Sequence, residues 1–189
     1  PITVLNLATF TGSLPFSLPD NVTTDTQVFA YLNSWKPAYP VGTEWQYSNA
    51  SIGLLGAILQ SQYHQPIDAI YQQMIFSPLK MTSSGLLLSS EQQAKLAQGY
   101  DKTGKAVPPT RYGFFPSAGD LKSTITDMSK FLAAAADAPA TDPEINIGMQ
   151  SAQTARVKLP DGTLQAMAWQ VNSLTRPDLL QAPTEMGLG

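Results

Sequence analysis

The sequence contains no cysteine and only one histidine among its 189 residues. The absence of cysteine excludes disulfide bonds and thiolate metal sites. A Ser-His-Asp triad would depend on His64 alone, which lies in the polar stretch SQYHQPID between two helical patterns. We expect His64 to be a solvated loop residue.

Charge is also sparse. Charged residues make up 13% of the chain, about half the usual share for a soluble domain, and the net charge is −3. The few basic residues are scattered singly, so we expect no nucleic-acid partner, which would need clustered Lys and Arg. No run of about eighteen uninterrupted apolar residues occurs, so we predict no membrane span. The 43% of apolar residues is enough to build a core.

Helical periodicity accounts for most of the chain. Thr24 and Gln27 fit a capping box, and Ser123 or Thr124 can cap a later helix. The patterns predict helices over residues 2–10, 27–35, 50–63, 66–75, 89–98 and 125–136, and one that begins at Pro143. In the fourth of these we expect one apolar face to be core: Ile67, Ile70, Tyr71, Met74 and Ile75.

Two segments show turn and strand signals. The stretch GYDKTGKAV predicts a hairpin or tight turn around Gly104. Residues 155–171 change to a period of two, and Pro160-Asp161-Gly162 is a strong turn signal between two strands. The sequence therefore predicts a mainly α fold with a C-terminal β-hairpin.

The stretch WQYSNASIGLLG places Tyr47 and Asn49 just before a small and apolar run. One interpretation is an ordinary helix start, with Ser48 or Asn49 as the N-cap. Its core face would then be Ile52, Leu55 and Leu59. The other interpretation is that the Tyr-x-Asn pair forms one wall of an active site, and the rest of the chain favours it.

Four segments occur in order along the chain: LNLATFTGSLP, PVGTEWQYSNASIGLLGAI, IFSPLKMTSS and PSAGDLKSTITDMSKFL. From Pro1 to about Val171 the chain resembles the class C β-lactamases. More broadly, it resembles the superfamily of serine β-lactamases, DD-peptidases and related esterases. Tyr-x-Asn alone is a weak motif, but four landmarks at comparable spacing are specific.

The resemblance implies acyl transfer without a metal or organic cofactor. In the family, the serine of Ser-x-x-Lys attacks the lactam carbonyl and a Lys-Thr-Gly strand lines the other side of the site. By resemblance, the phenol oxygen of Tyr47 helps to move protons. This role requires nearby cations, because a phenol with a pKa near 10 is otherwise a poor base. Asn49 would hydrogen-bond the first lysine and the substrate's side-chain amide.

The chain's own copies of the other two motifs are misplaced. The one Ser-x-x-Lys match, Ser77 to Lys80, follows Tyr47, whereas the family's nucleophile precedes it. The one Lys-Thr-Gly match, Lys102-Thr103-Gly104, lies in a polar turn rather than on an apolar strand. We interpret both as chance matches. We expect the true motifs before Pro1 and beyond Gly189.

The expected fold is thus the helical domain of the β-lactamase/transpeptidase-like fold, without most of the mixed α/β sheet domain. Residues 1–153 would form the helical domain that carries Tyr-x-Asn, and 154–189 the hairpin and the start of the return to the sheet. The missing sheet domain, or a second chain, would cover an apolar face that includes Trp169 and Val171. By resemblance, the parent protein would bind a β-lactam substrate and be periplasmic or secreted.

Two departures leave the substrate open. Ser17 stands where class C members often carry a glutamine that contacts the substrate's side-chain amide. Gly119 stands where a tyrosine lines the class C pocket, and this segment is more similar to that of the esterases and peptidases. The alternatives to a β-lactamase are a DD-peptidase or esterase of the same superfamily, or a catalytically silent helical module.

Overall fold

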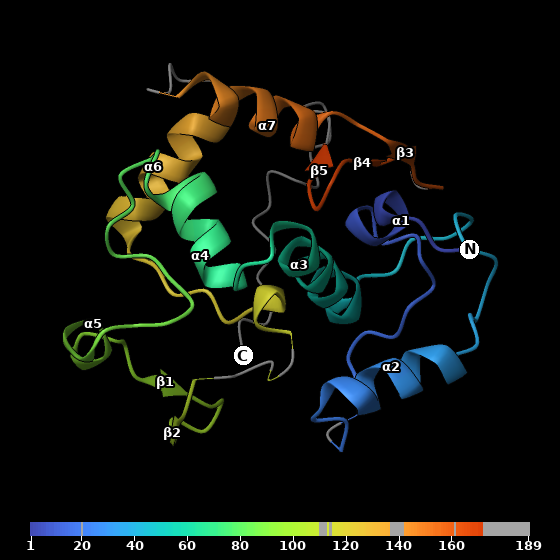
Figure 1. The fold of residues 1–189 in the computed structure, drawn as a ribbon, viewed down its shortest axis with the longest axis horizontal. Helices are drawn as coiled ribbons and strands as arrows, with labels where there is room; N and C mark the ends of the chain where they lie inside the picture. Colours follow the sequence, from blue (N-terminus) through green and yellow to red (C-terminus); the bar gives the residue numbers. More distant parts are fainter. Residues whose placement is uncertain (20, 110–112, 114, 137–141, 161, 172–189) are drawn as a thin grey trace.

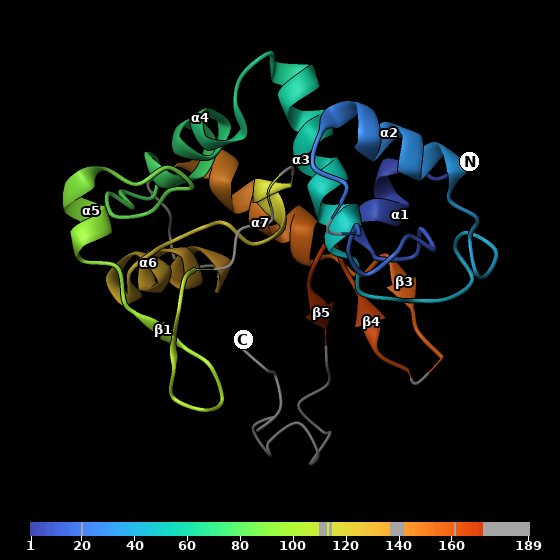
Figure 2. The same cartoon turned by 90° about the horizontal axis from the view of Figure 1, so that it is seen from below.

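The chain is described from a computed structural model, which covers all residues except 20, 110–112, 114, 137–141, 161 and 172–189. Helices dominate the described part, with α3 near the centre of the molecule in both views (Figures 1 and 2). They are α1 Val4–Ala8, α2 Asp25–Ser34, α3 Asn49–Tyr63, α4 Ile67–Tyr71, α5 Ser90–Ala94, α6 Ile125–Ala135 and α7 Pro143–Gln153. A π-helical turn, η1 Gln72–Phe76, continues α4, and a short 3₁₀ helix, η2 Pro116–Ala118, contacts α3.

Side-chain caps set the starts of the helices. Thr24 and Gln27 form the predicted capping box at α2. The hydroxyl of Ser48 accepts from Ser51 N–H at the start of α3, and Thr124 caps α6 in the same manner. Pro143 is the first residue of α7. At this position a backbone N–H would have no acceptor within the helix, so the N–H that proline lacks is not needed. The predicted positions of these starts are confirmed.

The buried face of α3 consists of small residues. Of the expected core face, Ile52 and Leu55 are only half-buried, and the expectation that Leu59 is core was wrong. Ala50, Gly53 and Gly56 are buried, whereas Leu59 is 36% exposed. A Cβ on Gly53 would lie 2.0 Å from Cγ of Phe115, and one on Gly56 would lie 2.2 Å from Oγ of Ser117. The helix packs where glycine permits close approach, and Phe115 joins Ala50 and Val28 in a core cluster.

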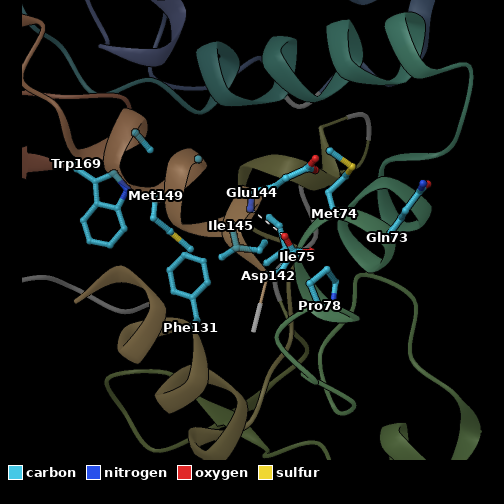
Figure 3. A pocket seen from close by; sticks show the side chains of 12 residues that line it. Gln73, Met74, Ile75, Pro78, Phe131, Asp142, Glu144, Ile145, Met149 and Trp169 are labelled. Atoms are coloured by element: carbon cyan, nitrogen blue, oxygen red, sulfur yellow. Dashed lines mark hydrogen bonds between the residues drawn. The ribbon is translucent and has the colours of Figure 1, made fainter. Parts of the chain in front are cut away.

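The helix after Pro66 departs from a regular α-helix. Ile67 and Ile70 are buried as predicted, but Met74 is 43% exposed and lines a cavity (Figure 3). The π-helical turn widens the backbone after Tyr71, so the following side chains rotate away from the predicted stripe. Phe76 is buried instead, and the expectation that Met74 is core was wrong.

The strands form two small antiparallel sheets. β1 Gly99–Tyr100 pairs with β2 Ala106–Val107, and Gly104 in their turn has a φ of +80°. The C-terminal sheet contains β3 Val157–Lys158, β4 Leu164–Gln165 and β5 Gln170–Val171, in the order β3-β4-β5. The predicted hairpin is therefore confirmed, with a third strand added to it.

The C-terminal sheet packs onto the helices. Ala168 N–H donates to the Ala8 carbonyl over 2.7 Å, and Met167 N–H donates to the Ala152 carbonyl over 3.0 Å. The ring of Trp169 stacks on Phe131 with centroids 6.5 Å apart. These contacts connect residues 166–169 to α1, α6 and α7.

Large apolar side chains remain exposed on the described surface. α6 carries a stripe of them, with Ile125 85%, Met128 41% and Leu132 65% exposed. Val171 is 38% exposed, whereas Trp169 is half-buried. Within the described residues, no helix has the length and apolar character that a bilayer crossing requires.

Candidate active site around Tyr47 and Asn49

Tyr47 and Asn49 flank Ser48, the N-cap residue of α3. Ser48 is the N-cap with extended backbone, and its hydroxyl accepts from Ser51 N–H over 3.0 Å. Tyr47 therefore precedes the helix and Asn49 is its first residue. Both residues of the Tyr-x-Asn motif therefore lie at the same end of α3. This placement agrees with the expectation that the motif forms one wall of an active site.

A loop segment, residues 15–17, is hydrogen-bonded to this helix start. Asn49 N–H donates to the Phe16 carbonyl over 2.8 Å, and the Ser48 hydroxyl donates to the Pro15 carbonyl over 2.7 Å. The Asn49 side-chain amide donates from Nδ2 to Ser17 Oγ over 3.1 Å. Asn49 is only 5% exposed, so these bonds fix its amide in place. The structure thus brings Ser17 and Asn49 together, two of the residues that the sequence singled out.

Two phenylalanines flank the ring of Tyr47. Its centroid lies 5.0 Å from that of Phe10 and 5.9 Å from that of Phe16. Phe10 is buried with a left-handed φ of 57°, which is uncommon for a bulky residue. Tyr47 remains 42% exposed. The two rings hold the Tyr47 ring while leaving part of it open to solvent.

Sequence reasoning missed Phe10 and Phe16 as site residues. Both lie in the first of the four landmark segments or directly after it, more than thirty residues before Tyr47. Their aromatic character was the available signal, but no periodicity links two residues in a loop to a third so far along the chain.

The loop before α3 is tied to residues 10–13. Gln46 N–H donates to the Phe10 carbonyl over 3.0 Å, and Gly42 N–H donates to the Thr11 carbonyl over 2.8 Å. Gly42 has a φ of +89°, which few other residues adopt. Tyr39 donates to Gln46 Oε1, and burial raises the pKa of Tyr39 above its ordinary value. These bonds hold the segment that precedes Tyr47 in the chain, whereas α3 holds the segment that follows it.

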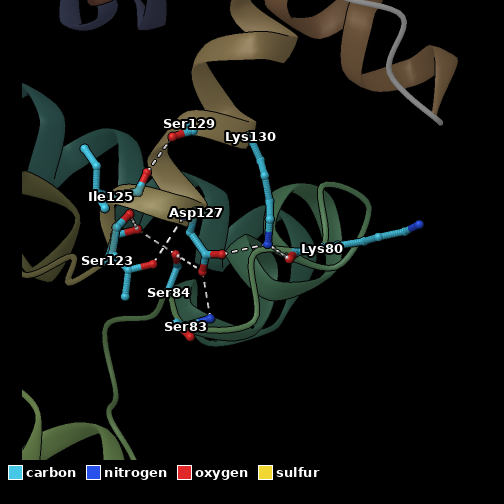
Figure 4. Close-up of polar contacts among 9 residues, drawn as sticks. Lys80, Ser83, Ser84, Ser123, Ile125, Asp127, Ser129 and Lys130 are labelled. Carbon is cyan, nitrogen blue, oxygen red and sulfur yellow. Dashed lines mark hydrogen bonds and ion pairs between the residues drawn. The ribbon is translucent and has the colours of Figure 1, made fainter.

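The two chance motif matches lie on other elements. Ser77 is exposed directly after η1, and the side chain of Lys80 extends away from its surroundings (Figure 4). Lys102, Thr103 and Gly104 form the exposed β1–β2 turn, where the Thr103 hydroxyl donates to Asp101. In Figures 1 and 2 this hairpin lies across the molecule from α1. Their interpretation as chance matches stays a prediction.

Two other residues complete the sequence-based set. His64 is exposed with a φ of 54° and ends α3, consistent with the predicted solvated position. Gly119 follows η2, and its N–H donates to the Pro116 carbonyl. Neither makes a described contact with Tyr47 or Asn49.

A buried carboxylate, Asp127, anchors the segment after Ser77 to α6 (Figure 4). It accepts from Ser83 N–H over 2.7 Å, from the Ser84 hydroxyl over 2.9 Å, and from Lys130 Nζ over 2.9 Å. Burial alone would raise the pKa of this carboxyl, but these bonds and the charge of Lys130 outweigh it and lower the pKa. Lys130 also donates to the Lys80 carbonyl. The cluster is a structural anchor.

Comparison with known proteins decides the family. A sequence model of the beta-lactamase family matches residues 1–187. The chain belongs to the β-lactamase family. Solved relatives share its fold, and the predicted mainly helical portion of that fold is confirmed.

Several β-lactamases are similar to this chain. Those of Lysobacter lactamgenus and Yersinia enterocolitica are 30% and 31% identical to it, over 89% and 91% of its length. A class C β-lactamase from Rhodobacter sphaeroides is 29% identical, with a TM-score of 0.85 over 95% of this chain. The beta-lactamase/D-alanine carboxypeptidase of Pseudomonas syringae is 27% identical, also with a TM-score of 0.85 over 95% of this chain.

This chain spans about half the length of these relatives. It covers 44% and 45% of the two curated proteins and 51% of each of the two solved structures. The predicted resemblance to the class C β-lactamases is confirmed, over about half of the length of these relatives.

Proposed function

We propose that the protein to which this chain belongs is a class C-like serine β-lactamase, which hydrolyses β-lactams through an acyl-serine intermediate. The observation that carries the proposal is the pairing of Tyr47 and Asn49 at the start of α3. The phenol ring is held between Phe10 and Phe16, and the amide is held by Ser17. Rigid placement of this kind is what proton transfer and substrate orientation require.

Tyr47 carries the proton-transfer role in this proposal. Its phenol oxygen would take the proton of the attacking serine and later pass one to the leaving nitrogen, provided that lysine ammonium groups lower its pKa. Because its ring remains 42% exposed, the remaining part of a site has room to approach it.

Asn49 carries the orienting role. A side-chain amide has two N–H donors and one acceptor oxygen. One donor is used by Ser17. The other donor can reach a carbonyl of the substrate's side-chain amide, while the oxygen can accept from a lysine ammonium.

The serine nucleophile and the two active-site lysines are proposed to come from residues outside this chain. The 189 residues alone are expected to be inactive, because removing the nucleophile of a covalent mechanism removes nearly all of the rate. No metal or organic cofactor is needed for this chemistry.

The remainder of the protein is also proposed to cover apolar surface on this chain. Exposed patches of a few hundred Å² usually mark an interaction. The stripe of Ile125, Met128 and Leu132 on α6 and the half-buried Trp169 with Val171 on the C-terminal sheet are candidates. The second candidate occupant is another copy of the chain. By family resemblance, we propose a periplasmic or secreted protein.

A DD-peptidase or esterase is the second candidate function. The similar Pseudomonas syringae protein is named as both a beta-lactamase and a D-alanine carboxypeptidase, and Ser17 and Gly119 depart from the class C pattern. A third candidate, a catalytically silent helical module, is favoured only if no Ser-x-x-Lys occurs in the rest of the protein.

Hydrolysis assays separate these functions. The protein encoded by the complete gene is assayed with a chromogenic cephalosporin, a p-nitrophenyl ester and a peptide that ends in D-Ala-D-Ala. We expect kcat/KM for the cephalosporin to exceed that for the ester and the peptide. Preference for the peptide or the ester would support the second candidate, and no hydrolysis of any of them would support the third.

A further inference from the structure

A cavity of about 500 Å³ opens between η1, α6 and α7 (Figure 3). Small-molecule sites in proteins commonly have volumes of about 300–1,000 Å³. Its described lining includes none of Tyr47, Asn49 and Ser17. The cavity is therefore a separate candidate for ligand binding on this chain.

The walls of the cavity are mostly apolar and include two aromatic rings. Phe131 and Trp169 lie nearly parallel, with an interplanar angle of 7°. Figure 3 shows Met149 beside this pair, and Met74 also lines the cavity. Flexible methionine side chains adapt to irregular apolar ligands, and aromatic faces attract rings and cations. This lining suits an aromatic or alkyl group.

The charged side chains among the described lining residues are all acidic. They are Asp142 and Glu144, and none of the described residues that line the cavity is basic. The Asp142 carboxylate accepts from Glu144 N–H over 2.9 Å as the N-cap of α7, which fixes its position. The partial positive charge at the helix N-terminus, about half an elementary charge, offsets only part of the two negative charges. The remaining negative potential favours a cation.

We propose that this cavity binds a small amphiphilic amine, with an apolar or aromatic group among Phe131, Met149 and Trp169 and an ammonium group near Asp142 and Glu144. The proposal does not depend on the β-lactamase activity. Apolar burial supplies the affinity, and the two carboxylates select an amine over a neutral or anionic analogue.

Gly148 offers a direct way to close the cavity. It lies in α7 and lines the cavity, and a Cβ added to it meets no heavy atom within 4 Å. Gly148→Phe therefore fills open space without a clash at its first side-chain atom. Phenylalanine also has a higher helix propensity than glycine, so this variant is expected to fold. Gly148→Ala is the small control, and Ile147→Phe is a matched control at a 68% exposed position of α7 outside the lining.

The test measures binding of three matched probes to the protein encoded by the complete gene. The probes are 4-phenylbutylammonium, 4-phenylbutanol and 4-phenylbutyrate, with Kd measured by calorimetry or ligand-observed NMR. We expect the ammonium probe to bind most tightly and the carboxylate least. Gly148→Phe should weaken its binding at least tenfold and Gly148→Ala much less, whereas Ile147→Phe leaves it within about twofold. Glu144→Gln should reduce the ratio of the Kd of the alcohol to the Kd of the ammonium probe about threefold.

Three results would overturn the proposal. The first is equal affinity for the three probes, and the second is ammonium binding that survives Gly148→Phe. The third is no binding of the ammonium probe; a lowered melting temperature for Gly148→Phe would then mean that another part of the protein fills the cavity. Melting curves for every variant separate lost binding from lost folding.

Discussion

The side-chain amide of Asn49 donates a hydrogen bond to the hydroxyl of Ser17, with 3.1 Å between Nδ2 and Oγ. Asn49 is 5% exposed, so it depends on protein partners rather than on water to satisfy this donor. In the proposed mechanism, the same amide orients the substrate. In that mechanism, Ser17 would be a positioning residue, which acts through Asn49.

Ser17→Ala should lower kcat/KM for cephalosporins about fivefold, because one hydrogen bond of about 1 kcal/mol holds the amide. The loss should be smaller for ester substrates that lack a side-chain amide. Steady-state kinetics on both substrate types measure the difference. Ser61→Ala, at an exposed position of α3, is the control. Equal losses on both substrates would argue against positioning through Asn49.

Tyr47→Phe should lower kcat by about 10²–10⁴-fold in the complete protein, the range for a proton-transfer group. The ring and its contacts with Phe10 and Phe16 are retained, so the free energy of unfolding should change by no more than about 1.5 kcal/mol, the contribution of one hydrogen bond. Tyr63→Phe, at a similarly exposed position, should leave both quantities unchanged. A kcat within threefold of the parent would remove Tyr47 from the mechanism.

Substitution of glycine by alanine should have opposite effects on stability at two helical positions, 53 and 148. Gly53→Ala would place Cβ 2.0 Å from Cγ of Phe115 and should destabilise the fold by about 1–3 kcal/mol. Gly148→Ala meets open space and should stabilise it by about 0.5–1 kcal/mol. Chemical denaturation of both variants tests the packing of α3. Similar effects of the two substitutions would contradict the close contact with Phe115.

The Asp127 cluster predicts an acid-dependent stability. The pKa of this carboxyl is lower in the folded chain than in the unfolded chain, so folding favours its ionised form. Its contribution is fully present above the unfolded pKa of about 3.9 and is lost as pH falls through the lower folded pKa. Asp127→Asn should lower the free energy of unfolding by about 2 kcal/mol near pH 7. One carboxylate oxygen accepts from both Ser83 N–H and the Ser84 hydroxyl, and an amide nitrogen in its place could not accept these bonds.

The measurement is urea denaturation of the parent and Asp127→Asn between pH 7 and pH 2.5. The gap between their unfolding free energies should stay constant down to about pH 4 and narrow below it. A gap that is independent of pH throughout would show that the charge of Asp127 does not stabilise the fold. Asp68→Asn provides a comparison at another carboxylate that accepts backbone N–H bonds.

Local sequence signals predicted where most elements lie. Thr24 with Gln27, Thr124 and Pro143 mark helix starts because capping depends on residues only a few positions apart. Gly104 marks a turn because its positive φ is a local requirement. These signals need no knowledge of the rest of the fold.

Packing and the site geometry were less predictable. Apolar periodicity in α3 favoured Leu59 as core, but contact with Phe115 selected the glycine side of the helix. The Tyr47–Asn49 pair was found through family resemblance. The flanking rings of Phe10 and Phe16 depend on contacts between distant segments, which no short-range pattern contains.

The most direct test of the account locates the acyl group. The complete protein is trapped with a slowly hydrolysed β-lactam, digested, and analysed by tandem mass spectrometry. We predict one β-lactam adduct, on a serine outside the 189 residues described here, and little adduct formation in the Tyr47→Phe variant. An adduct on Ser77 would contradict the account, because it would make the chance Ser-x-x-Lys match the true nucleophile.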